Sequence, residues 1–290
     1  MRRACIDIGS NTTRLLVADC TEGRVTPVHQ ERAFTYLAWT RLAGGAIAPD
    51  KLDEVARVVA HQLTSAGRLG CEQVRAVATA AIRRAPNGHD LTAAVRQACG
   101  LEVEILTEEE EARLAFVGAA SALGHGGAVS LGVVDVGGGS SELVVGQAPD
   151  RVAWSASFAL GSGDWARRYL RSDPPSSEEI AGARREVDET LGGLDVPRPA
   201  EAAAVGGSAA SLARLAGRVL DAAAFARALT ELVAAPGQEV ARRFGLEIER
   251  VRLLPAGLVI LQAAAERFGA PLIVAGGGLR EGLLLEASGV

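Results

Sequence analysis

Two similar segments lie 128 positions apart in this chain, and this internal repeat constrains the fold more than any other feature. CIDIGSNTTRLLVA begins at Cys5, and VVDVGGGSSELVVG begins at Val133. In each copy an apolar run reaches an aspartate, turns on glycine and small polar residues, and returns as a second apolar run, which is the pattern of a β-hairpin. The repeat therefore predicts two related half-molecules, each offering a glycine-containing loop to a shared cleft.

The remaining pattern predicts an α/β protein with mixed sheets, because hairpins occur among strands that alternate with helices. Expected strands cover residues 4–8, 13–19, 25–31, 74–79, 101–106 and 272–275, a second hairpin spans 129–146, and a short strand is expected at AAAV. Expected helices run from an N-cap at Asp50 to a stop at Gly70, over 91–98, over 108–123, from near Ser176, and at the end of the chain.

At 290 residues the chain is long enough for two domains at roughly 150 residues each. We place the boundary in GHGG, at Gly124, Gly126 and Gly127, which gives domains at 1–124 and 125–290, with the last helix free to pack back on the first domain. No apolar run approaches the ~18 residues of a membrane span, and the N-terminus lacks a signal-peptide core. We expect a cytoplasmic protein that does not bind membranes.

Composition excludes several kinds of site. The four cysteines and four histidines have no metal-ligand spacing, so we expect buried thiols rather than disulfides or a zinc site. The net charge is −5, and no patch of basic and aromatic residues indicates nucleic acid. An anionic ligand would therefore have to be attracted locally.

Glycine loops allow backbone N–H groups to converge on an anion, most often a phosphate. The loops are not P-loops, because GxxxxGK[ST] is missing and Lys51 is the only lysine; nor are they Rossmann loops, because GGGSSE leads into a strand. A tight turn is the simpler alternative for either loop alone. Asp7 and Asp135 could hold Mg²⁺ against phosphate oxygens, or each could cap its own turn.

The motifs DIGSNTTRLLV, VVDVGGGSSELVVG, AVGGSAASL and GGGLREGLLLE resemble those of the exopolyphosphatase and guanosine pentaphosphate phosphohydrolase (Ppx/GppA) family, within the actin-like superfamily. The resemblance implies two RNase H-like (actin-like ATPase) domains, each a mixed sheet flanked by helices, with the active site in the cleft between them. It also implies hydrolysis of the terminal phosphate of inorganic polyphosphate, or of pppGpp to ppGpp, with Mg²⁺ or Mn²⁺ as cofactor.

The resemblance assigns roles to individual residues. It implies that Glu111 activates the attacking water, that Glu142 positions water or metal, and that Arg83 binds the phosphate chain; Asp7 and Asp135 are the expected metal ligands. For Glu108, Glu109 and Glu110 we expect only that they complement the helix dipole. The expected phosphate-binding residues are Gly9, Ser10, Asn11, Thr12, Gly137, Gly138, Gly139, Ser140, Ser141, Gly206, Gly207 and Ser208.

The sequence departs from the family pattern in two respects. Gly276 stands where many relatives carry an acidic residue, and the C-terminal helical domains of long members are missing from this sequence, from which we expect short substrates. Two other functions stay open: an ATP-dependent phosphotransferase of the same superfamily, and a non-catalytic sensor of polyphosphate or an alarmone. The sequence also leaves open whether the protein forms a homodimer.

Overall fold

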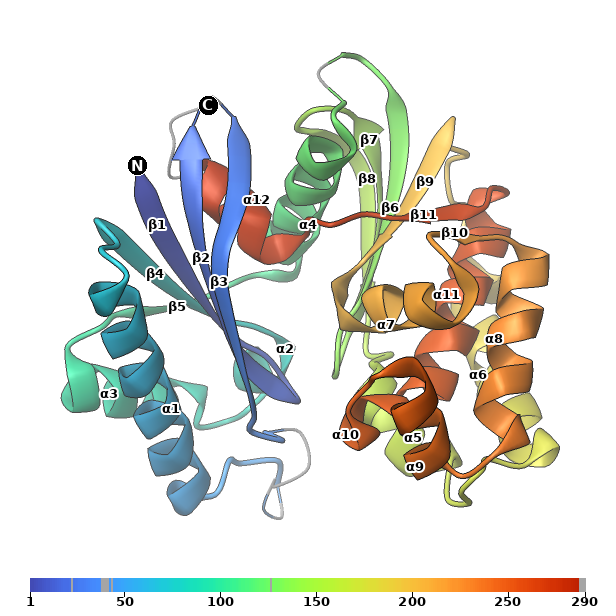
Figure 1. The fold of residues 1–290 in the computed structure, drawn as a ribbon, viewed down its shortest axis with the longest axis horizontal. Helices are drawn as coiled ribbons and strands as arrows, with labels where there is room; N and C mark the ends of the chain where they lie inside the picture. The colour runs from blue at the N-terminus through green and yellow to red at the C-terminus, as the bar shows by residue number, and fades with distance from the viewer. Residues whose placement is uncertain (22, 38–41, 43, 126, 287–290) are drawn as a thin grey trace. The chain divides into compact units, whose positions relative to one another are not determined.

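The computed structural model describes residues 1–21, 23–37, 42, 44–125 and 127–286, and in it the chain forms two compact units (Figure 1). Unit 1 comprises Met1–Leu114 and the C-terminal segment that begins at Leu279, and unit 2 comprises Ala115–Gly278. The chain leaves unit 1 inside helix α4 (Glu108–Leu123). The predicted boundary, at Gly124 to Gly127, follows the end of this helix. Gly126 lies outside the described residues, so the predicted boundary stays a prediction.

Unit 1 contains a mixed five-stranded sheet in the order β3-β2-β1-β4-β5. β1 pairs antiparallel with β2 and parallel with β4, β2 pairs antiparallel with β3, and β4 pairs parallel with β5. The strands are β1 (Arg2–Ile8), β2 (Thr12–Thr21), β3 (Arg24–Phe34), β4 (Gln73–Ala78) and β5 (Val103–Ile105).

Unit 2 repeats this arrangement in the sheet order β10-β11-β9-β6-β7-β8. β6, β7, β8, β9 and β11 have the pairing directions of β1 to β5, and β10 is added antiparallel at the edge. The strands are β6 (Ser130–Val136), β7 (Ser141–Gln147), β8 (Arg151–Phe158), β9 (Glu201–Val205), β10 (Val219–Leu220) and β11 (Leu272–Val274). Two mixed sheets of one topology confirm the predicted α/β fold with duplicated halves.

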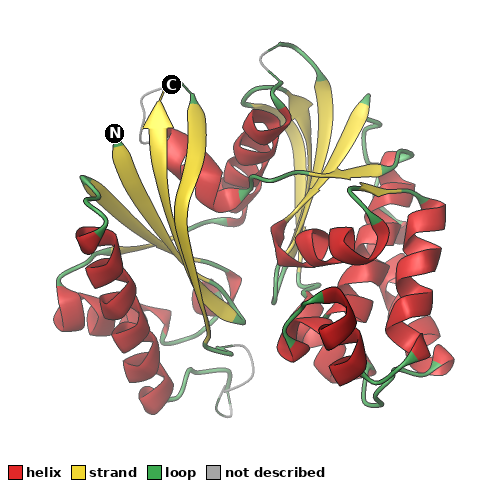
Figure 2. Ribbon diagram, in the orientation of Figure 1, coloured by secondary structure: helices red, strands yellow, loops and turns green. Residues whose placement is uncertain are grey.

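Helices flank each sheet, as Figure 2 shows for each unit. In unit 1 they are α1 (Pro49–Arg68), α2 (Ala80–Arg83), α3 (Gly88–Cys99) and α12 (Leu279–Glu286). In unit 2 they are α5 (Ser162–Tyr169), α6 (Ser177–Gly192), α7 (Gly206–Ala216), α8 (Ala222–Ala234), α9 (Gly237–Phe244), α10 (Ile248–Val251) and α11 (Leu254–Phe268).

The central strand β1 is buried on both faces of the first sheet, and its successive side chains point to opposite sides. Ile6 packs into one cluster with residues of α1 and α3. Its neighbour Cys5 packs into another, with Leu114 of α4 and with Leu283 and Leu284 of α12. The last helix thus packs on the sheet that contains the N-terminal strand.

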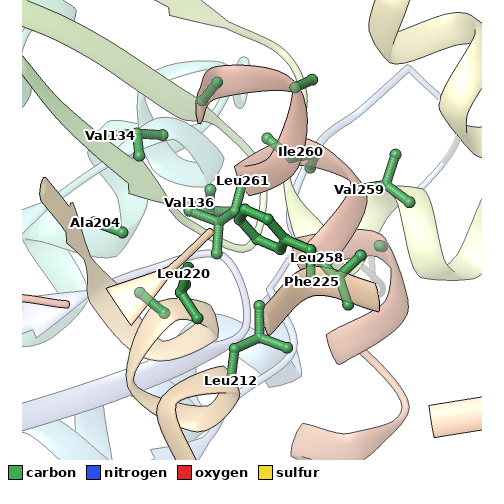
Figure 3. Packing of buried hydrophobic residues seen from close by; sticks show 14 of the residues in the cluster. Val134, Val136, Ala204, Leu212, Leu220, Phe225, Leu258, Val259, Ile260 and Leu261 are labelled. Carbon is green, nitrogen blue, oxygen red and sulfur yellow. The ribbon is translucent and has the colours of Figure 1, made fainter. Parts of the chain in front are cut away.

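The core of unit 2 fills the space between its sheet and helices α6, α7, α8 and α11. Figure 3 shows its centre, where Val134 and Val136 of β6 lie near Phe225 of α8 and Leu261 of α11. The backbone of Gly278 packs directly against α4 at Gly118. Only glycine allows this contact, because a Cβ on Gly118 would lie 2.0 Å from the Gly278 carbonyl oxygen.

One local expectation was wrong, and another was confirmed only in part. Asp50 is not the N-cap of α1: the helix begins at Pro49, after Ala48, and Asp50 lies in its first turn. Proline suits the first helical position because its missing N–H would have no intrahelical partner there. Of the cysteines, Cys5 and Cys20 are buried, whereas Cys71 and Cys99 are only partly covered.

Within the part of the chain that the structure describes, none of the helices is both long and apolar enough to span a membrane.

Candidate active site

The loops that join the two strands of each predicted hairpin share one backbone hydrogen bond. In unit 1 the N–H of Gly9 donates to the carbonyl of Thr12 at 3.0 Å, and in unit 2 the N–H of Gly137 donates to the carbonyl of Ser140 at 3.0 Å. A Cβ on Gly9 would lie 3.3 Å from the Thr12 oxygen, and one on Gly137 would lie 3.1 Å from the Ser140 oxygen. Glycine at these two places therefore keeps each turn tight.

The loop of unit 2 is anchored to the start of α5. The N–H groups of Ser162 and Gly163 donate to the carbonyls of Gly137 and Gly138 at 2.9 and 3.0 Å. A Cβ on Gly161 would lie 2.2 Å from the backbone of Gly138, so only glycine allows this approach. The first-turn N–H groups of α5 thus bind the loop, which fixes its shape.

Buried polar side chains lie in both loops. Ser10 and Asn11 are buried in unit 1, and Ser140 and Ser141 are buried in unit 2. The Ser141 hydroxyl donates to the carbonyl of Leu160. The side-chain oxygen of Asn11 is buried and finds no hydrogen-bond partner among the described residues, although buried polar atoms are usually paired.

The two aspartates occupy equivalent places but have different partners. Both are half-buried near the ends of β1 and β6. Asp7 faces Arg14 across the β1–β2 pair, and Asp135 faces Glu142 across the β6–β7 pair. Burial raises the pKa of Asp7 above its ordinary value, while the charges of Arg280 and Arg14 oppose that shift. The two sites are therefore electrostatically unlike: a mixed pair in unit 1 and two carboxylates in unit 2.

Glu142 is buried, and one of its carboxylate oxygens accepts a hydrogen bond from the Ser157 hydroxyl at 3.1 Å. Directly opposed residues of an antiparallel pair lie on the same face of the sheet, with Cβ atoms about 5 Å apart. Asp135 and Glu142 therefore place two acidic groups side by side. Such an arrangement is unfavourable for two ionised carboxylates unless a cation or a proton lies between them.

Helix α7 begins beside Asp135. Gly206 has φ +84°, and a Cβ there would lie 2.4 Å from the Oδ1 atom of Asp135, so this position requires glycine for two reasons. A Cβ on Gly207 would lie 2.8 Å from the guanidinium of Arg250. Ser208 is buried, and its hydroxyl has no hydrogen-bond partner in the described part of the chain. The helix N-terminus, with its positive dipole end, thus meets a buried arginine.

Arg250 was not among the residues predicted for the site. The residue lies in the short helix α10 and is buried. Nothing in the local sequence IERV indicates a site, because its contact with Gly207 comes from tertiary packing. Arginine is rarely buried, and the burial of Arg250 beside the start of α7 is the signal that only the structure reveals.

In unit 1, Arg83 and Glu111 are brought together by the end of α2 and the start of α4. The guanidinium of Arg83 donates to Oε2 of Glu111, to the carbonyl of Leu106 at 2.8 Å and to Oε1 of Glu108 at 3.3 Å. Glu111 is buried. Burial by itself would lower the pKa of Arg83, but the hydrogen bonds and negative charges of Glu111 and Glu108 together outweigh burial, so the pKa is raised and the guanidinium stays charged.

A capping box explains why α4 begins where it does. The Thr107 N–H donates to the Glu110 carboxylate at 2.8 Å, and the Glu110 N–H contacts the Thr107 hydroxyl at 3.2 Å. This reciprocal pair satisfies two N–H groups at the helix start. It fixes the first turn, in which Glu108 and Glu111 lie on one face, three residues apart. Glu110 therefore has a specific structural role beyond the helix dipole, and Glu109 is exposed.

The predicted metal ligands can be tested against this geometry. In the described ranges, no cluster of three or more histidine, cysteine or acidic side chains could hold a metal ion. Mg²⁺ commonly uses only one or two protein carboxylates and completes its shell with water and phosphate oxygens. Asp135 and the opposed Glu142 form a pair of carboxylates of that kind, whereas Asp7, the other predicted ligand, is opposed by Arg14.

Comparison with known proteins gives consistent results. A family model described as the Ppx/GppA phosphatase family matches residues 16–289. Exopolyphosphatase 1 of Mycobacterium leprae (strain TN) is 30% identical over 303 residues, which covers 98% of this chain and 89% of that protein. Exopolyphosphatase 2 of Mycobacterium tuberculosis (strain ATCC 25618 / H37Rv) is 37% identical over 199 residues, covering 66% of this chain and 61% of that protein.

Solved structures are similar over nearly the whole chain. The crystal structure of the Aquifex aeolicus member of the Ppx/GppA family has a TM-score of 0.82 and 29% identity, covering 99% of this chain and 97% of that chain. An exopolyphosphatase from Cytophaga hutchinsonii ATCC 33406 has a TM-score of 0.87 and 22% identity, covering 100% and 99%. At that identity the second likeness supports the fold alone.

Proposed function

Because this chain belongs to the Ppx/GppA phosphatase family and is therefore a hydrolase, we propose that it is an exopolyphosphatase. The proposed reaction is hydrolysis of the terminal anhydride bond of short inorganic polyphosphate, and the same chemistry would convert pppGpp to ppGpp. Water forms a bond to the terminal phosphorus, the bridging P–O bond breaks, and the products are orthophosphate and a chain shorter by one phosphate.

The observation that best supports this mechanism is the buried Glu111 carboxylate held by Arg83. A general base must be fixed in position to orient water in line with the phosphorus, and it then accepts the proton of that water. The guanidinium fixes one carboxylate oxygen. We propose that the other oxygen contacts the attacking water, and that Arg83 also binds an oxygen of the phosphate chain.

Phosphate binding is assigned to the two glycine loops and to the start of α7. Two buried polar atoms without partners among the described residues support this: the side-chain oxygen of Asn11 in the first loop and the hydroxyl of Ser208 in α7. A buried polar group that lacks a partner suggests a ligand or water that completes its hydrogen bonds. If the Asn11 amide is turned over, its NH₂ group would donate to phosphate oxygens. The remaining proposed phosphate ligands are Gly9, Ser10, Thr12, Gly137, Gly138, Gly139, Ser140, Ser141, Gly206 and Gly207.

We further propose that Asp135 holds Mg²⁺ or Mn²⁺ together with Glu142, and that Asp7 is the corresponding metal ligand in the loop of unit 1. The register of β6 and β7 supports this for the first two residues, since it opposes their side chains directly. When bound, the metal would neutralise the charge that develops on the phosphate oxygens. Asp7 differs because the positive charges of Arg280 and Arg14 act on its carboxylate and oppose part of the effect of burial.

A substrate panel tests the proposal. Phosphate release is measured from tripolyphosphate, polyphosphates of graded length, pppGpp and ATP, with Mg²⁺ and with Mn²⁺, and without any acceptor. We expect release from polyphosphate under these conditions. ADP formation that requires an added acceptor would instead show a phosphotransferase, and tight binding with no release would show a sensor.

Replacing the proposed base gives the first mutational prediction. We expect Glu111→Gln to lower kcat by at least about 100-fold, because the amide cannot accept the proton of water, while polyphosphate still binds. Glu109→Gln is the matched control, because it removes an exposed carboxylate from the same helical turn. Steady-state kinetics and calorimetric binding of tripolyphosphate measure the two effects. Unchanged turnover in the Glu111 variant would remove the base assignment.

A further inference from the structure

Glu108 has a contact that the helix dipole does not explain. Its Oε1 atom lies 3.3 Å from Nη2 of Arg83 and 3.5 Å from Nη2 of Arg84. One carboxylate thus bridges two adjacent arginines at the end of α2. Both arginines and the carboxylate belong to unit 1, so the cluster is defined by this unit alone.

The two carboxylates that contact Arg83 differ in burial. The Glu111 side chain is 7% exposed and the Glu108 side chain is 43% exposed. The ion pair with Glu111 is shielded from water, whereas the pair with Glu108 is open to solvent and therefore weak. Of the two, Glu108 is the partner that an incoming anion can displace.

We propose that Glu108 competes with phosphate: it occupies the phosphate-binding face of Arg83 and Arg84 in the free protein, and a phosphate group must displace it. A phosphate presents two or three oxygens to the same donors, so it can replace a single carboxylate without leaving either arginine unpaired. Meanwhile Nη1 of Arg83 keeps its hydrogen bond to Glu111, so the base stays in position during the exchange.

This exchange has a consequence for the product. Orthophosphate carries less charge than a polyphosphate chain and has no further phosphates to bind elsewhere. It competes poorly with Glu108, whose carboxylate is tethered next to the arginines at high effective concentration. Glu108 therefore weakens retention of the released phosphate. The role in turnover depends on the proposed function; the competition between Glu108 and phosphate does not.

Binding of inorganic phosphate and of tripolyphosphate to the full-length protein tests the competition directly. We expect Glu108→Gln to bind inorganic phosphate about fivefold more tightly than the wild type, because one competing charge is removed. Glu109→Gln is the control, since it changes the net charge equally and its side chain is exposed on the same turn. We expect its dissociation constant to lie within about twofold of the wild type.

The tighter phosphate binding should depend on the guanidinium of Arg83. Arg83→Ala in the Glu108→Gln background should therefore abolish the increase in affinity. Glu108→Ala provides a second form of the charge removal, and circular dichroism checks that each variant is folded. The proposal is overturned if Glu108→Gln and Glu108→Ala bind phosphate no more tightly than Glu109→Gln, or if neither they nor the wild type bind phosphate or tripolyphosphate. Absence of phosphate release from polyphosphate would refute the proposed function instead.

Discussion

Asp135 shows how strongly one residue can depend on its surroundings. Its carboxylate lies against Gly206, which must be glycine, and opposite Glu142 on the neighbouring strand. We expect Asp135→Asn to raise the Mg²⁺ concentration for half-maximal activity by about tenfold or more, equivalent to ~1.4 kcal/mol, because one of two opposed charges is lost. Titrating Mg²⁺ in the phosphate-release assay measures the effect.

Asp150→Asn is the control for that experiment, because it removes the same charge from unit 2 at an exposed turn position. Its Mg²⁺ requirement should match that of the wild type. An Asp135 variant whose Mg²⁺ dependence equals that of the Asp150 variant would be inconsistent with a metal role.

Single residues differ in how far the sequence could predict them. The repeat identifies Asp7 and Asp135 because each ends an apolar run before a glycine turn. The sequence could not show that Arg83 contacts Glu111, since that pairing depends on how β4 and β5 align before α2 and α4. The contact of Arg250 with Gly207 could not be predicted either, because it also comes from tertiary packing.

At the level of elements, helix α6 depends on a capping box formed by Ser176 and Glu179. Burial opposes ionisation of Glu179, but hydrogen bonds from the Ser172 hydroxyl and from the N–H groups of Ser176, Arg171 and Ser172 together outweigh it. Together they lower its pKa from 4.5 to about 2. The ionised carboxylate therefore stabilises the folded state more than the unfolded chain.

The sign of the pH dependence follows from this lowered pKa. The stabilisation is complete above pH 4.5, the ordinary pKa, and is lost as pH falls toward about 2. We expect Glu179→Ala to lower the free energy of unfolding by about 1 kcal/mol at pH 7, with the difference from wild type shrinking below pH 4.5. Urea unfolding at several pH values measures it. Glu178→Ala, on the exposed neighbour, should show neither effect.

Elements with a complete local signal were predictable, and the others were not. The SSEE sequence at the start of α6 contains its own cap, and the expected helix start near Ser176 is confirmed. Helix α1 has no side-chain cap, and the sequence pattern therefore wrongly indicated Asp50 as its N-cap. Strand β8 was not predicted, because its sequence RVAWSASF has no long apolar run. It is an edge strand that pairs with β7.

At the scale of the whole molecule, the chain forms part of unit 1, then all of unit 2, and returns to unit 1 with α12. Leu283 of this helix is fully buried against strands β1 and β2. Glu286 at its end pairs with Arg75 and Arg113, which lowers the pKa of Glu286 despite its partial burial. The first sheet therefore depends on residues at the far end of the sequence, a relation that the repeat alone could not reveal.

Because the first sheet packs against α12, a mutation in α12 should destabilise unit 1. Removing most of a buried leucine costs about 2–5 kcal/mol, so Leu283→Ala should destabilise unit 1 by that amount. Because two compact units can unfold separately, we expect amide hydrogen exchange to accelerate in β1 and β2 while protection in β6 and β7 is kept. Val28→Ala, at a residue of unit 1 that is 42% exposed, is the control and should change exchange little. Equal acceleration in both sheets would mean that the units unfold as one, and acceleration confined to α12 would mean that the first sheet is stable without it.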